Sequence, residues 1–230
     1  MAKFAVIGLG RFGYTVATEL FTNGIEVVAI DYDEKKIEEI KDKVTTPLII
    51  DSTDENALRN SGISDMDGIV LAIGSNVEAS ILTAAILKKI GISNIYAKVD
   101  SKIHSRILKM IGIQNIYFPE VQVGKQLSKF LLSSNVLKYT ELSGDMSIAE
   151  LLAPEEFVGK TLQELALPID HGVNIVAIKT EELSVGEDGE NIINNEINSM
   201  PGANDIVKSG DVLILTGEPV NLDKLILPPK

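Results

Sequence analysis

Three glycines near the start of the chain, Gly8, Gly10 and Gly13, have the spacing of a phosphate-binding turn. The apolar residues 3–7 before them predict a buried strand, and the apolar spacing in residues 11–23 predicts a helix. In this context the first glycine allows a tight turn, the second leaves room for phosphates, and the third lets the helix pack closely. The free N–H groups at the helix N-terminus attract an anion. The motif therefore predicts nucleotide binding, with a structural turn that binds nothing as the alternative.

A carboxylate ends the second apolar run of the sequence, because Asp31 lies 18 residues after Gly13. At that position an acidic side chain accepts hydrogen bonds from the ribose hydroxyls of an adenosine group. It repels a phosphate on the ribose 2′-oxygen, which disfavours NADP. Asp33 is a second candidate, and its alternative role is to cap the helix that follows.

Polar residues after further apolar runs extend the candidate site, because open α/β sheets bind ligands at the carboxyl ends of their strands. Residues 51–53 follow the third run, with capping of the next helix as their alternative role. Lys98 ends the fifth run, where a lysine either reaches a polyphosphate or is simply solvated. The candidate cofactor-binding residues are Gly8, Gly10, Arg11, Phe12, Gly13, Asp31, Tyr32, Asp33, Asp51, Ser52, Thr53, Ile73, Gly74, Ser75, Asn76 and Lys98.

The elements that position these residues alternate between strand-like and helix-like segments. Short connections between such units require right-handed crossovers and a parallel sheet with helices on both faces. The expected fold is therefore α/β, a Rossmann-like doubly wound sheet. Gly24, Gly91 and Gly112 follow three of the helices and favour left-handed caps. The expected strands are 3–7, 26–30, 47–50, 68–73, 94–99 and 115–118, and the expected helices are 11–23, 33–43, 54–60, 77–90 and 102–111.

The rest of the chain has a different pattern and predicts a second, smaller α+β domain, with a boundary near residue 135. Residues 120–134 predict an amphipathic helix, and we expect its apolar face to pack on a neighbouring subunit; packing on its own domain is the alternative. Residues 146–152 fit a strand or a helix, and the acidic residues 181–195 fit a long hairpin or a mobile loop. The remaining expected elements are strands 136–142, 173–179 and 211–216 and helix 159–165.

The charge of the chain is unevenly distributed. The chain has 33 acidic and 21 basic residues and a net charge of −12. Residues 1–136 hold 16 acidic and 15 basic side chains, whereas residues 137–230 hold 17 and 6, with no arginine. This disfavours nucleic acid or an anionic membrane as a direct partner. The absence of cysteine excludes disulfides and thiolate chemistry. No apolar run reaches the ~18–20 residues that span a bilayer, so we expect a soluble protein.

Motifs that carry catalysis are missing from the sequence. It contains no Walker motif, no metalloprotease motif and no Ser–His–Asp or Tyr–Lys spacing. The two histidines, His104 and His171, are isolated, and His104 is expected at the surface of a charged helix. We therefore expect a binding protein rather than an enzyme. The alternatives are an NAD-dependent oxidoreductase, which needs a proton donor and a substrate pocket, and an NAD(H)-sensing Rossmann protein; a repressor would need a basic DNA-binding element.

Several runs of the sequence, taken in order, carry a family resemblance. FAVIGLGRFG, AIDYDE, IDSTDE, LAIGSNVEASILTAAILKKIG, YAKVDS and YFPE resemble the TrkA-N domain of the RCK family. FVGKTLQEL, GVNIVAIK and SGDVLILTG resemble its TrkA-C domain. The resemblance implies a nucleotide-binding domain over residues 1–118, a crossover and dimerisation helix over 119–136, and a C-terminal domain over 137–230.

Within that family the chain resembles the cytosolic regulatory subunits of bacterial Ktr-type potassium uptake systems. The resemblance implies dimers that assemble into an octameric ring beneath a membrane-embedded potassium-translocating partner. The implied location is therefore cytoplasmic, at the inner face of the membrane. The resemblance also implies that ATP or ADP, and in some relatives NAD(H), binds the first domain and changes the shape of the ring, with the ATP-bound ring favouring conduction.

The resemblance also implies roles for single residues. Arg11 corresponds to the arginine that meets the γ-phosphate of ATP, and Lys98 to a further phosphate contact. Glu120 corresponds to a residue near the nucleotide that takes part in binding a divalent cation, Mg²⁺ or Ca²⁺, at the dimer interface. Val121 and Gln122 stand where relatives commonly have Arg-Asp, so the surroundings of Glu120 differ.

A ligand of the second domain is also implied. Many relatives bind cyclic di-AMP there, and Gly172, Asn174, Ile175 and Pro201 lie near the corresponding positions. The arginine that usually precedes this glycine is absent, and a dianionic ligand would meet a domain of net charge −11. The charge therefore counts against cyclic di-AMP.

Overall fold

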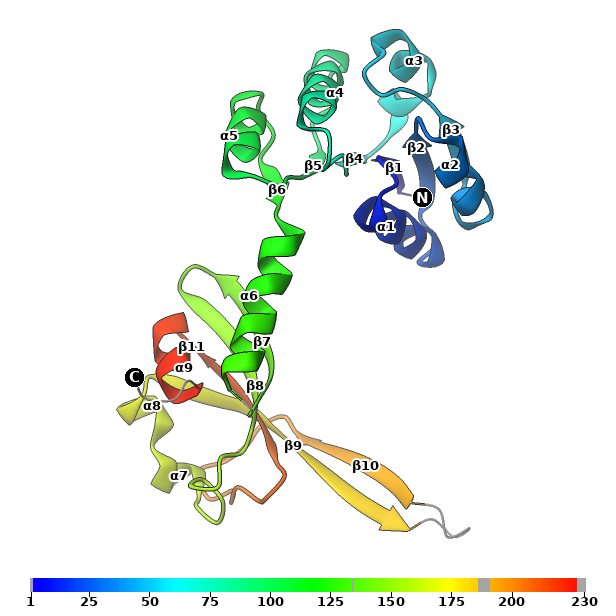
Figure 1. The fold of residues 1–230 in the computed structure, drawn as a ribbon. Coiled ribbons are helices and arrows are strands. Elements are labelled where there is room, and N and C mark those ends of the chain that lie inside the picture. Colours follow the sequence, from blue (N-terminus) through cyan, green and yellow to red (C-terminus); the bar gives the residue numbers. More distant parts are fainter. Residues whose placement is uncertain (1, 134, 186–190, 227–230) are drawn as a thin grey trace. The chain divides into compact units, whose positions relative to one another are not determined.

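The computed structural model describes residues 2–133, 135–185 and 191–226. The chain divides into two compact units, Met1–Glu120 and Val121–Lys230 (Figure 1). The boundary between them lies inside one helix, α6, which runs from Pro119 to Leu132. Each unit has its own sheet and its own apolar core, and each is described by itself below.

The first unit contains the expected doubly wound sheet. All of its strand pairs are parallel, and the strand order is β3-β2-β1-β4-β5-β6. The direction of winding changes between β1 and β4, and the carboxyl ends on either side of such a point diverge to leave a ligand crevice. The strands are β1 (Lys3–Ile7), β2 (Glu26–Asp31), β3 (Thr46–Ile49), β4 (Gly68–Leu71), β5 (Ile95–Lys98) and β6 (Asn115–Tyr117).

Helices cover both faces of this sheet, because apolar side chains alternate along its central strands. Ile7 and Leu71 belong to the core cluster that includes residues of α3, α4 and α5, and Val6 and Val70 belong to the cluster that includes residues of α1 and α2. The helices are α1 (Arg11–Thr22), α2 (Glu34–Ile40), α3 (Glu55–Asn60), α4 (Val77–Ile90) and α5 (Lys102–Met110), with short 3₁₀ turns at Lys41–Lys43 and Ile63–Asp65. Gly24, Gly91 and Gly112 have positive φ after α1, α4 and α5, as expected.

Four of these helices begin at a residue whose side chain accepts a backbone N–H of the first turn. The capping residues are Asp33 for α2, Asp54 for α3, Asn76 for α4 and Ser101 for α5. Such caps satisfy N–H groups that have no partner inside the helix. Asp33 therefore takes its alternative role, whereas the cap considered for residues 51–53 is supplied by Asp54.

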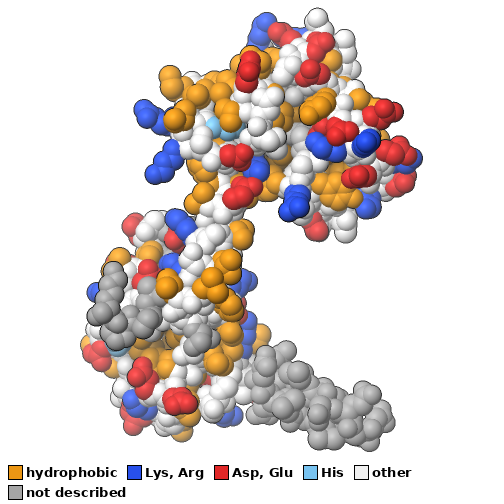
Figure 2. Space-filling model, viewed as in Figure 1, with side chains coloured by type: hydrophobic (Ala, Val, Ile, Leu, Met, Phe, Trp, Pro, Cys, Tyr) orange, Lys and Arg blue, Asp and Glu red, His pale blue; other side chains and the backbone are white. Residues whose placement is uncertain are grey.

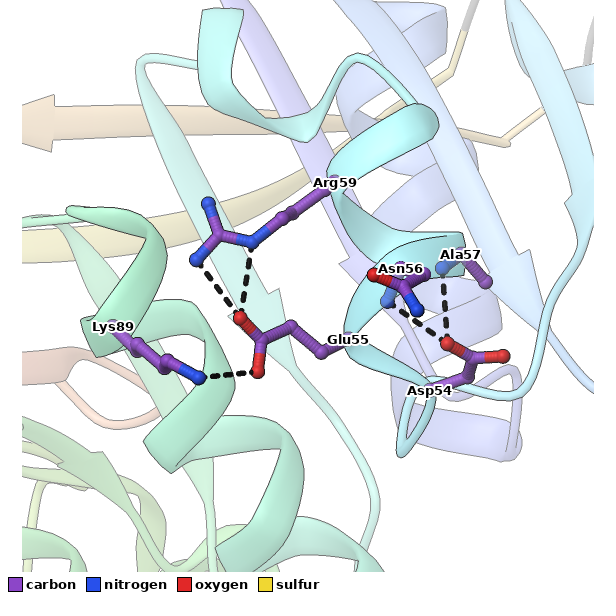
Figure 3. Close-up of polar contacts among 6 residues, drawn as sticks. All are labelled: Asp54, Glu55, Asn56, Ala57, Arg59 and Lys89. Atoms are coloured by element: carbon purple, nitrogen blue, oxygen red, sulfur yellow. Dashed lines mark hydrogen bonds and ion pairs between the residues drawn. The ribbon is translucent and has the colours of Figure 1, made fainter.

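The short helix α3 is held by charged contacts as well as by its cap (Figure 3). Oε1 of Glu55 accepts hydrogen bonds from Arg59 one turn further on, at 2.9 and 3.0 Å. Oε2 of Glu55 accepts a hydrogen bond from Nζ of Lys89 in α4, at 2.7 Å. The hydrogen bonds from Lys89 and Arg59 lower the pKa of the Glu55 carboxyl. The contact with Lys89 connects α3 to α4, whose N-terminus borders the cavity described below.

His104 is buried, and the expectation that it lies at the surface is wrong. It is 0% exposed, and its Nε2 atom lies 3.1 Å from Oγ of Ser80, so the two side chains meet between α5 and α4. Its Nδ1 atom has no hydrogen-bond partner among the described residues. Lys102 and Arg106 are exposed on the same helix, but His104 and Leu108 lie on its buried face. Burial lowers the pKa of His104, although Asp100 acts in the opposite direction.

We expect the stability of the protein to fall as the pH drops below the ordinary histidine pKa of 6.5. The unfolded chain takes up a proton on His104 near that pH, whereas the folded chain takes it up only at lower pH. The free energy of unfolding therefore decreases by up to about 1.4 kcal/mol per pH unit within that window. Chemical denaturation at pH 7.5, 6.5 and 5.5 measures this slope.

Two variants separate His104 from other titrating groups. His104→Gln should flatten the slope, and His171→Gln, at an exposed histidine, is the control substitution. A slope that is the same in the wild type and in His104→Gln would show that the buried histidine does not set the pH dependence.

The helix α6 contributes no buried residue in this chain. Near its C-terminal end, Nζ of Lys129 lies 2.9 Å from Oδ1 of Asp223 and 3.3 Å from the ring centroid of Tyr139. These contacts join the helix to the rest of the second unit. Its apolar residues Leu127 and Leu131 remain exposed, and apolar side chains are visible along α6 in Figure 2.

The second unit is an antiparallel sheet with short helices, as expected for a small α+β domain. Its strand order is β10-β9-β11-β8-β7, and its core packs apolar residues of the sheet against the helices. The strands are β7 (Val136–Ser143), β8 (Met146–Leu152), β9 (Val173–Val185), β10 (Asn191–Asn198) and β11 (Val212–Gly217). The helices are α7 (Leu162–Leu165), α8 (Leu167–Asp170) and α9 (Pro219–Ile226).

The structure settles two open assignments in this unit and adds two elements. Residues 146–152 form a strand, and much of 181–195 belongs to the antiparallel hairpin of β9 and β10; residues 186–190 lie outside the described residues. The predicted helix at 159–165 is shorter and begins after Thr161, whose side chain and that of Glu164 form a reciprocal capping box. The helices α8 and α9 were not expected.

Candidate functional site

A cavity of about 590 Å³ lies at the carboxyl end of the parallel sheet, within the first unit. Pockets of this size hold small organic ligands and cofactors. The cavity is lined by the last residue of β1 and by the residues that follow β4, where the direction of winding changes. Its lining residues are Ile7, Gly8, Gly10, Arg11, Phe12, Ile30, Asp31, Tyr32, Lys36, Ile50, Asp51, Ser52, Thr53, Ala72, Ile73, Gly74, Ser75, Asn76, Ala79, Lys98 and Glu120.

The three glycines of the turn meet different requirements. Gly8 has a φ of +93°, which side chains other than glycine rarely adopt. A Cβ atom on Gly13 would lie 1.9 Å from the carbonyl oxygen of Gly8, so α1 packs against the turn only with glycine at that position. A Cβ atom on Gly10 would meet no atom within 4 Å, because it points into open space. Gly10 therefore leaves room that a ligand can use.

The N-terminus of α1 differs from those of α2–α5. Its N-cap residue is Gly10, no side chain caps it, and its first turn contains no acidic residue. The N–H groups of that turn carry partial positive charge and point away from the helix. Arg11 adds a full positive charge in the same turn, and no carboxylate lies within ion-pair distance of it in the part of the chain that the structure describes. This end of the cavity attracts an anion.

Asp31 lines the cavity, but its carboxylate is already engaged by the protein. Oδ2 accepts hydrogen bonds from the backbone N–H of Leu9 at 2.7 Å and from Nζ of Lys36 at 3.1 Å. Oδ1 accepts one from the backbone N–H of Asp33 at 2.9 Å. The side chain is 3% exposed. Asp31 thus holds the glycine turn to the end of β2 in addition to facing the ligand space.

Lys98 and Glu120 form an ion pair at another wall of the cavity. Nζ of Lys98 lies 2.7 Å from Oε1 of Glu120 and 3.5 Å from Oδ1 of Asp100. The hydrogen bond between them raises the pKa of Lys98 and lowers the pKa of Glu120. A Cβ atom on Gly74 would lie 2.9 to 3.0 Å from Asp100 and Lys98, so these charges contact the end of β4 closely.

The polar residues after β3 are organised around Asp51. Oδ1 of Asp51 accepts hydrogen bonds from the backbone N–H and the hydroxyl of Thr53, which lower the pKa of the Asp51 carboxyl. Ser52 is buried, and its hydroxyl lies 2.8 Å from that of Thr83 in α4. Asp51, Ser52 and Thr53 all line the cavity and make this part of its wall polar.

The structure brings most of the predicted site residues into one cavity. Gly13 and Asp33 are the exceptions, since Gly13 packs against the turn from behind and Asp33 caps α2. Sequence reasoning missed a set of lining residues that consists of apolar strand ends, one helical alanine and one lysine: Ile7, Ile30, Ile50, Ala72, Ala79 and Lys36. Only Lys36 offered a signal, as a cation in the first turns of the helix that follows Asp31.

The candidate residues of the second unit lie on two different segments. Asn174 and Ile175 are on β9, opposite Thr216 and Leu215 of β11. Pro201 follows the end of β10. Binding of a ligand by these residues stays a prediction.

Within the described ranges, no helix combines the length and the apolar character needed to cross a bilayer. Among those same residues, no group of three or more His, Cys, Asp or Glu side chains is arranged to hold a metal ion.

Comparison with known protein families identifies both units. Residues 4–119 match the TrkA-N domain, and residues 146–227 match the TrkA-C domain. The chain is 37% identical over 222 residues to the Ktr system potassium uptake protein C of Bacillus subtilis (strain 168), which covers 96% of this chain and 95% of that protein. It is 34% identical over 215 residues to the Ktr system potassium uptake protein A of the same organism, covering 94% and 91%.

Solved structures share the fold at low sequence identity. The RCK domain of GsuK matches with a TM-score of 0.63 and 16% identity, over 98% of this chain and 47% of that chain. The GsuK channel bound to NAD matches with a TM-score of 0.63 and 16% identity, over 100% of this chain and 40% of that chain. This chain thus spans less than half of each GsuK chain. On the strength of the two domain matches and the close relatives, the chain belongs to the RCK family of TrkA-N and TrkA-C domain proteins, together with the Ktr potassium uptake proteins.

Proposed function

We propose that this protein is a nucleotide-gated regulatory subunit of a potassium uptake system and not an enzyme. The observation that carries the proposal is the cavity with its glycine turn, in a chain that is alike over nearly its whole length to Ktr potassium uptake proteins. The nucleotide in the first unit sets the state of a membrane-embedded potassium-translocating partner. The protein acts at the cytoplasmic face of the membrane through that partner, without inserting itself.

In this proposal ATP contacts Arg11 through its γ-phosphate, which ADP does not have. The γ-phosphate supplies an anion for the arginine and for the uncapped N-terminus of α1, and ADP lacks it. A ligand shifts a conformational equilibrium only through contacts that differ between the two states. Glu120 provides one carboxylate toward a divalent cation, which requires that it leave Lys98.

The exposed apolar face of α6 supports assembly as part of the same proposal. Leu127, Phe130 and Leu131 are between 49% and 73% exposed in the isolated chain. A second copy of the chain that packs on this face buries these side chains, and such dimers build the proposed octameric ring. Each fully buried leucine or phenylalanine stabilises the dimer by roughly 1.5–3 kcal/mol.

We expect the full chain to be a dimer or larger at micromolar concentration in multi-angle light scattering. Replacing both Leu127 and Leu131 by glutamate places two charges on the apolar face and should lower the mass toward that of one chain, because the charges lose hydration on burial. Val220→Glu, at an exposed apolar residue of α9, serves as the matched control and should leave the mass unchanged. A wild-type protein that is monomeric would contradict the assembly.

A single titration series tests the nucleotide binding that gating requires. Calorimetry with ATP, ADP, NADH and cyclic di-AMP should give binding of the adenine nucleotides at one site per chain. The fold shared with the NAD-bound GsuK channel favours NADH as a competitor for that site. Cyclic di-AMP should not compete, because its candidate residues lie in the other unit. If none of these nucleotides binds, the proposal is refuted.

The second candidate function is an NAD-dependent oxidoreductase. The observation in its favour is the same cavity, which has room for a dinucleotide. Incubation of the protein with NADH and a panel of small aldehydes and ketones, followed at the absorbance of NADH, distinguishes the two. Turnover would replace the regulatory proposal by the enzymatic one.

A further inference from the structure

Lys36 occupies an unusual place for a cation, because it contacts the carboxylate that is expected to bind ribose. Its Nζ atom lies 3.1 Å from Oδ2 of Asp31, and the side chain lines the cavity. Lys36 belongs to α2, and its ammonium also lies 5.8 Å from the ring centroid of Tyr32, which lines the cavity as well. The cation is therefore a wall of the cavity at the Asp31 end.

Asp31 has little capacity left to accept further hydrogen bonds. A carboxylate offers about four lone-pair positions. Three are taken here, by the N–H groups of Leu9 and Asp33 and by the ammonium of Lys36. The two backbone donors are part of the glycine turn and the β2 end, whereas Lys36 is 36% exposed and can move. A ribose with two free hydroxyls can therefore bind Asp31 through both of them only if Lys36 gives way.

The same ammonium suits a phosphate at this end of the ligand. It has three donors, and one is used on Asp31. A carboxylate alone repels a phosphate group, but a cation about 3 Å away cancels most of that repulsion at the distance of a bound ligand. Because the Asp31 carboxylate is paired with Lys36, it repels a 2′-phosphate less than an unpaired carboxylate would.

We infer that Lys36 determines which adenosine ribose the cavity accepts: it competes with an unmodified ribose for Asp31 and binds the phosphate of a 2′-phosphorylated adenine nucleotide. This inference rests on the proposed function, because it requires that an adenine nucleotide binds with its ribose at Asp31. Lys36 acts on the ligand directly when the 2′-phosphate is present and through Asp31 when it is absent.

The test compares two ligands that differ only in the 2′-phosphate, AMP and adenosine 2′,5′-bisphosphate, by calorimetry on the full chain. Lys36→Met should raise the affinity for AMP severalfold, because Asp31 is freed, and lower the affinity for the bisphosphate roughly tenfold, because an ammonium–phosphate contact is lost. Lys36→Arg should retain bisphosphate binding. Lys35→Met is the matched control, since Lys35 is the exposed neighbour that does not line the cavity, and it should change neither affinity.

The outcomes separate this inference from the proposal beneath it. If ATP, ADP, NADH and AMP all fail to bind the wild type, the proposed function is wrong and the inference falls with it. If they bind but Lys36→Met weakens both members of the matched pair equally, or leaves the bisphosphate unaffected, Lys36 is not the specificity determinant while nucleotide binding stands. The same comparison with NADH and NADPH repeats the test on a second matched pair, and Lys36→Gln replaces the methionine variant if that variant unfolds.

Discussion

Replacing Arg11 by alanine is expected to lower the affinity for ATP by roughly 10- to 100-fold and to change the affinity for ADP by less than about threefold. Arg11 lines the cavity beside the uncapped N-terminus of α1, where no carboxylate of the described residues pairs with it. A third phosphate is the anion that this guanidinium lacks, and a charge-assisted contact with it exists for ATP alone. Calorimetric titration of both nucleotides at fixed ionic strength measures the two affinities.

Arg106→Ala is the matched control, because Arg106 is an exposed arginine of α5 that does not line the cavity. It should leave both affinities unchanged, which excludes a general effect of net charge. Equal losses for ATP and ADP in Arg11→Ala would mean that the arginine contacts a phosphate common to both, and the role at the γ-phosphate would have to be abandoned. A guanidinium beside a helix N-terminus is repelled by the partial positive charge there. Without nucleotide, Arg11→Ala should therefore be slightly more stable than the wild type.

Replacing Gly13 by alanine is expected to destabilise the first unit by about 3 kcal/mol or more, at the upper end of the usual effect of overpacking. The new methyl group would lie 1.9 Å from the carbonyl oxygen of Gly8, and that oxygen belongs to backbone that cannot rotate away as a side chain does. Either α1 moves off the sheet or the turn deforms. The gain in helix propensity, about 1 kcal/mol, does not offset this. The unfolding temperature of the Gly13→Ala variant should therefore fall by roughly 10 °C.

Gly10→Ala, in the same motif, should weaken nucleotide binding and leave the stability almost unchanged. A Cβ atom at Gly10 meets nothing within 4 Å, and its φ of −69° suits any residue, so the unfolding temperature should be nearly unchanged. The methyl group would occupy the open space beside the helix N-terminus, so nucleotide affinity should fall. Equal unfolding temperatures for the two alanine variants would show that close packing at Gly13 does not limit stability, and unimpaired binding by Gly10→Ala would place the phosphates elsewhere.

Local features of the sequence were enough to predict most of the first unit. The period of the apolar residues distinguishes strand from helix, and the glycines and capping residues mark where each element ends. The sequence allows two roles for Asp33, and the structure shows the local one, the cap of α2. The second unit was less predictable, because short strands leave few periods to count: residues 146–152 stayed ambiguous, and α8 and α9 were missed.

Side-chain partners that are distant in the chain could not be predicted in the same way. His104 has charged neighbours in sequence, yet it is buried against Ser80, which lies 24 residues earlier. Lys36 has no motif of its own, and its role follows from the position of Asp31 at the end of another element. Such contacts depend on how helices pack across a sheet, and no local pattern contains that information.

By itself, the sequence determined the parallel α/β unit, the glycine turn at its first strand and the family to which the chain belongs, because these depend on local spacing and on runs of identical residues. Only the tertiary structure decided which charges face one another: Lys98 with Glu120, and Lys36 with Asp31. Electrostatic pairing falls steeply with distance, so a cation acts as a free ligand-binding group or as the partner of a carboxylate according to a few ångströms of folded geometry. That difference separates Arg11 from the two lysines of the same cavity.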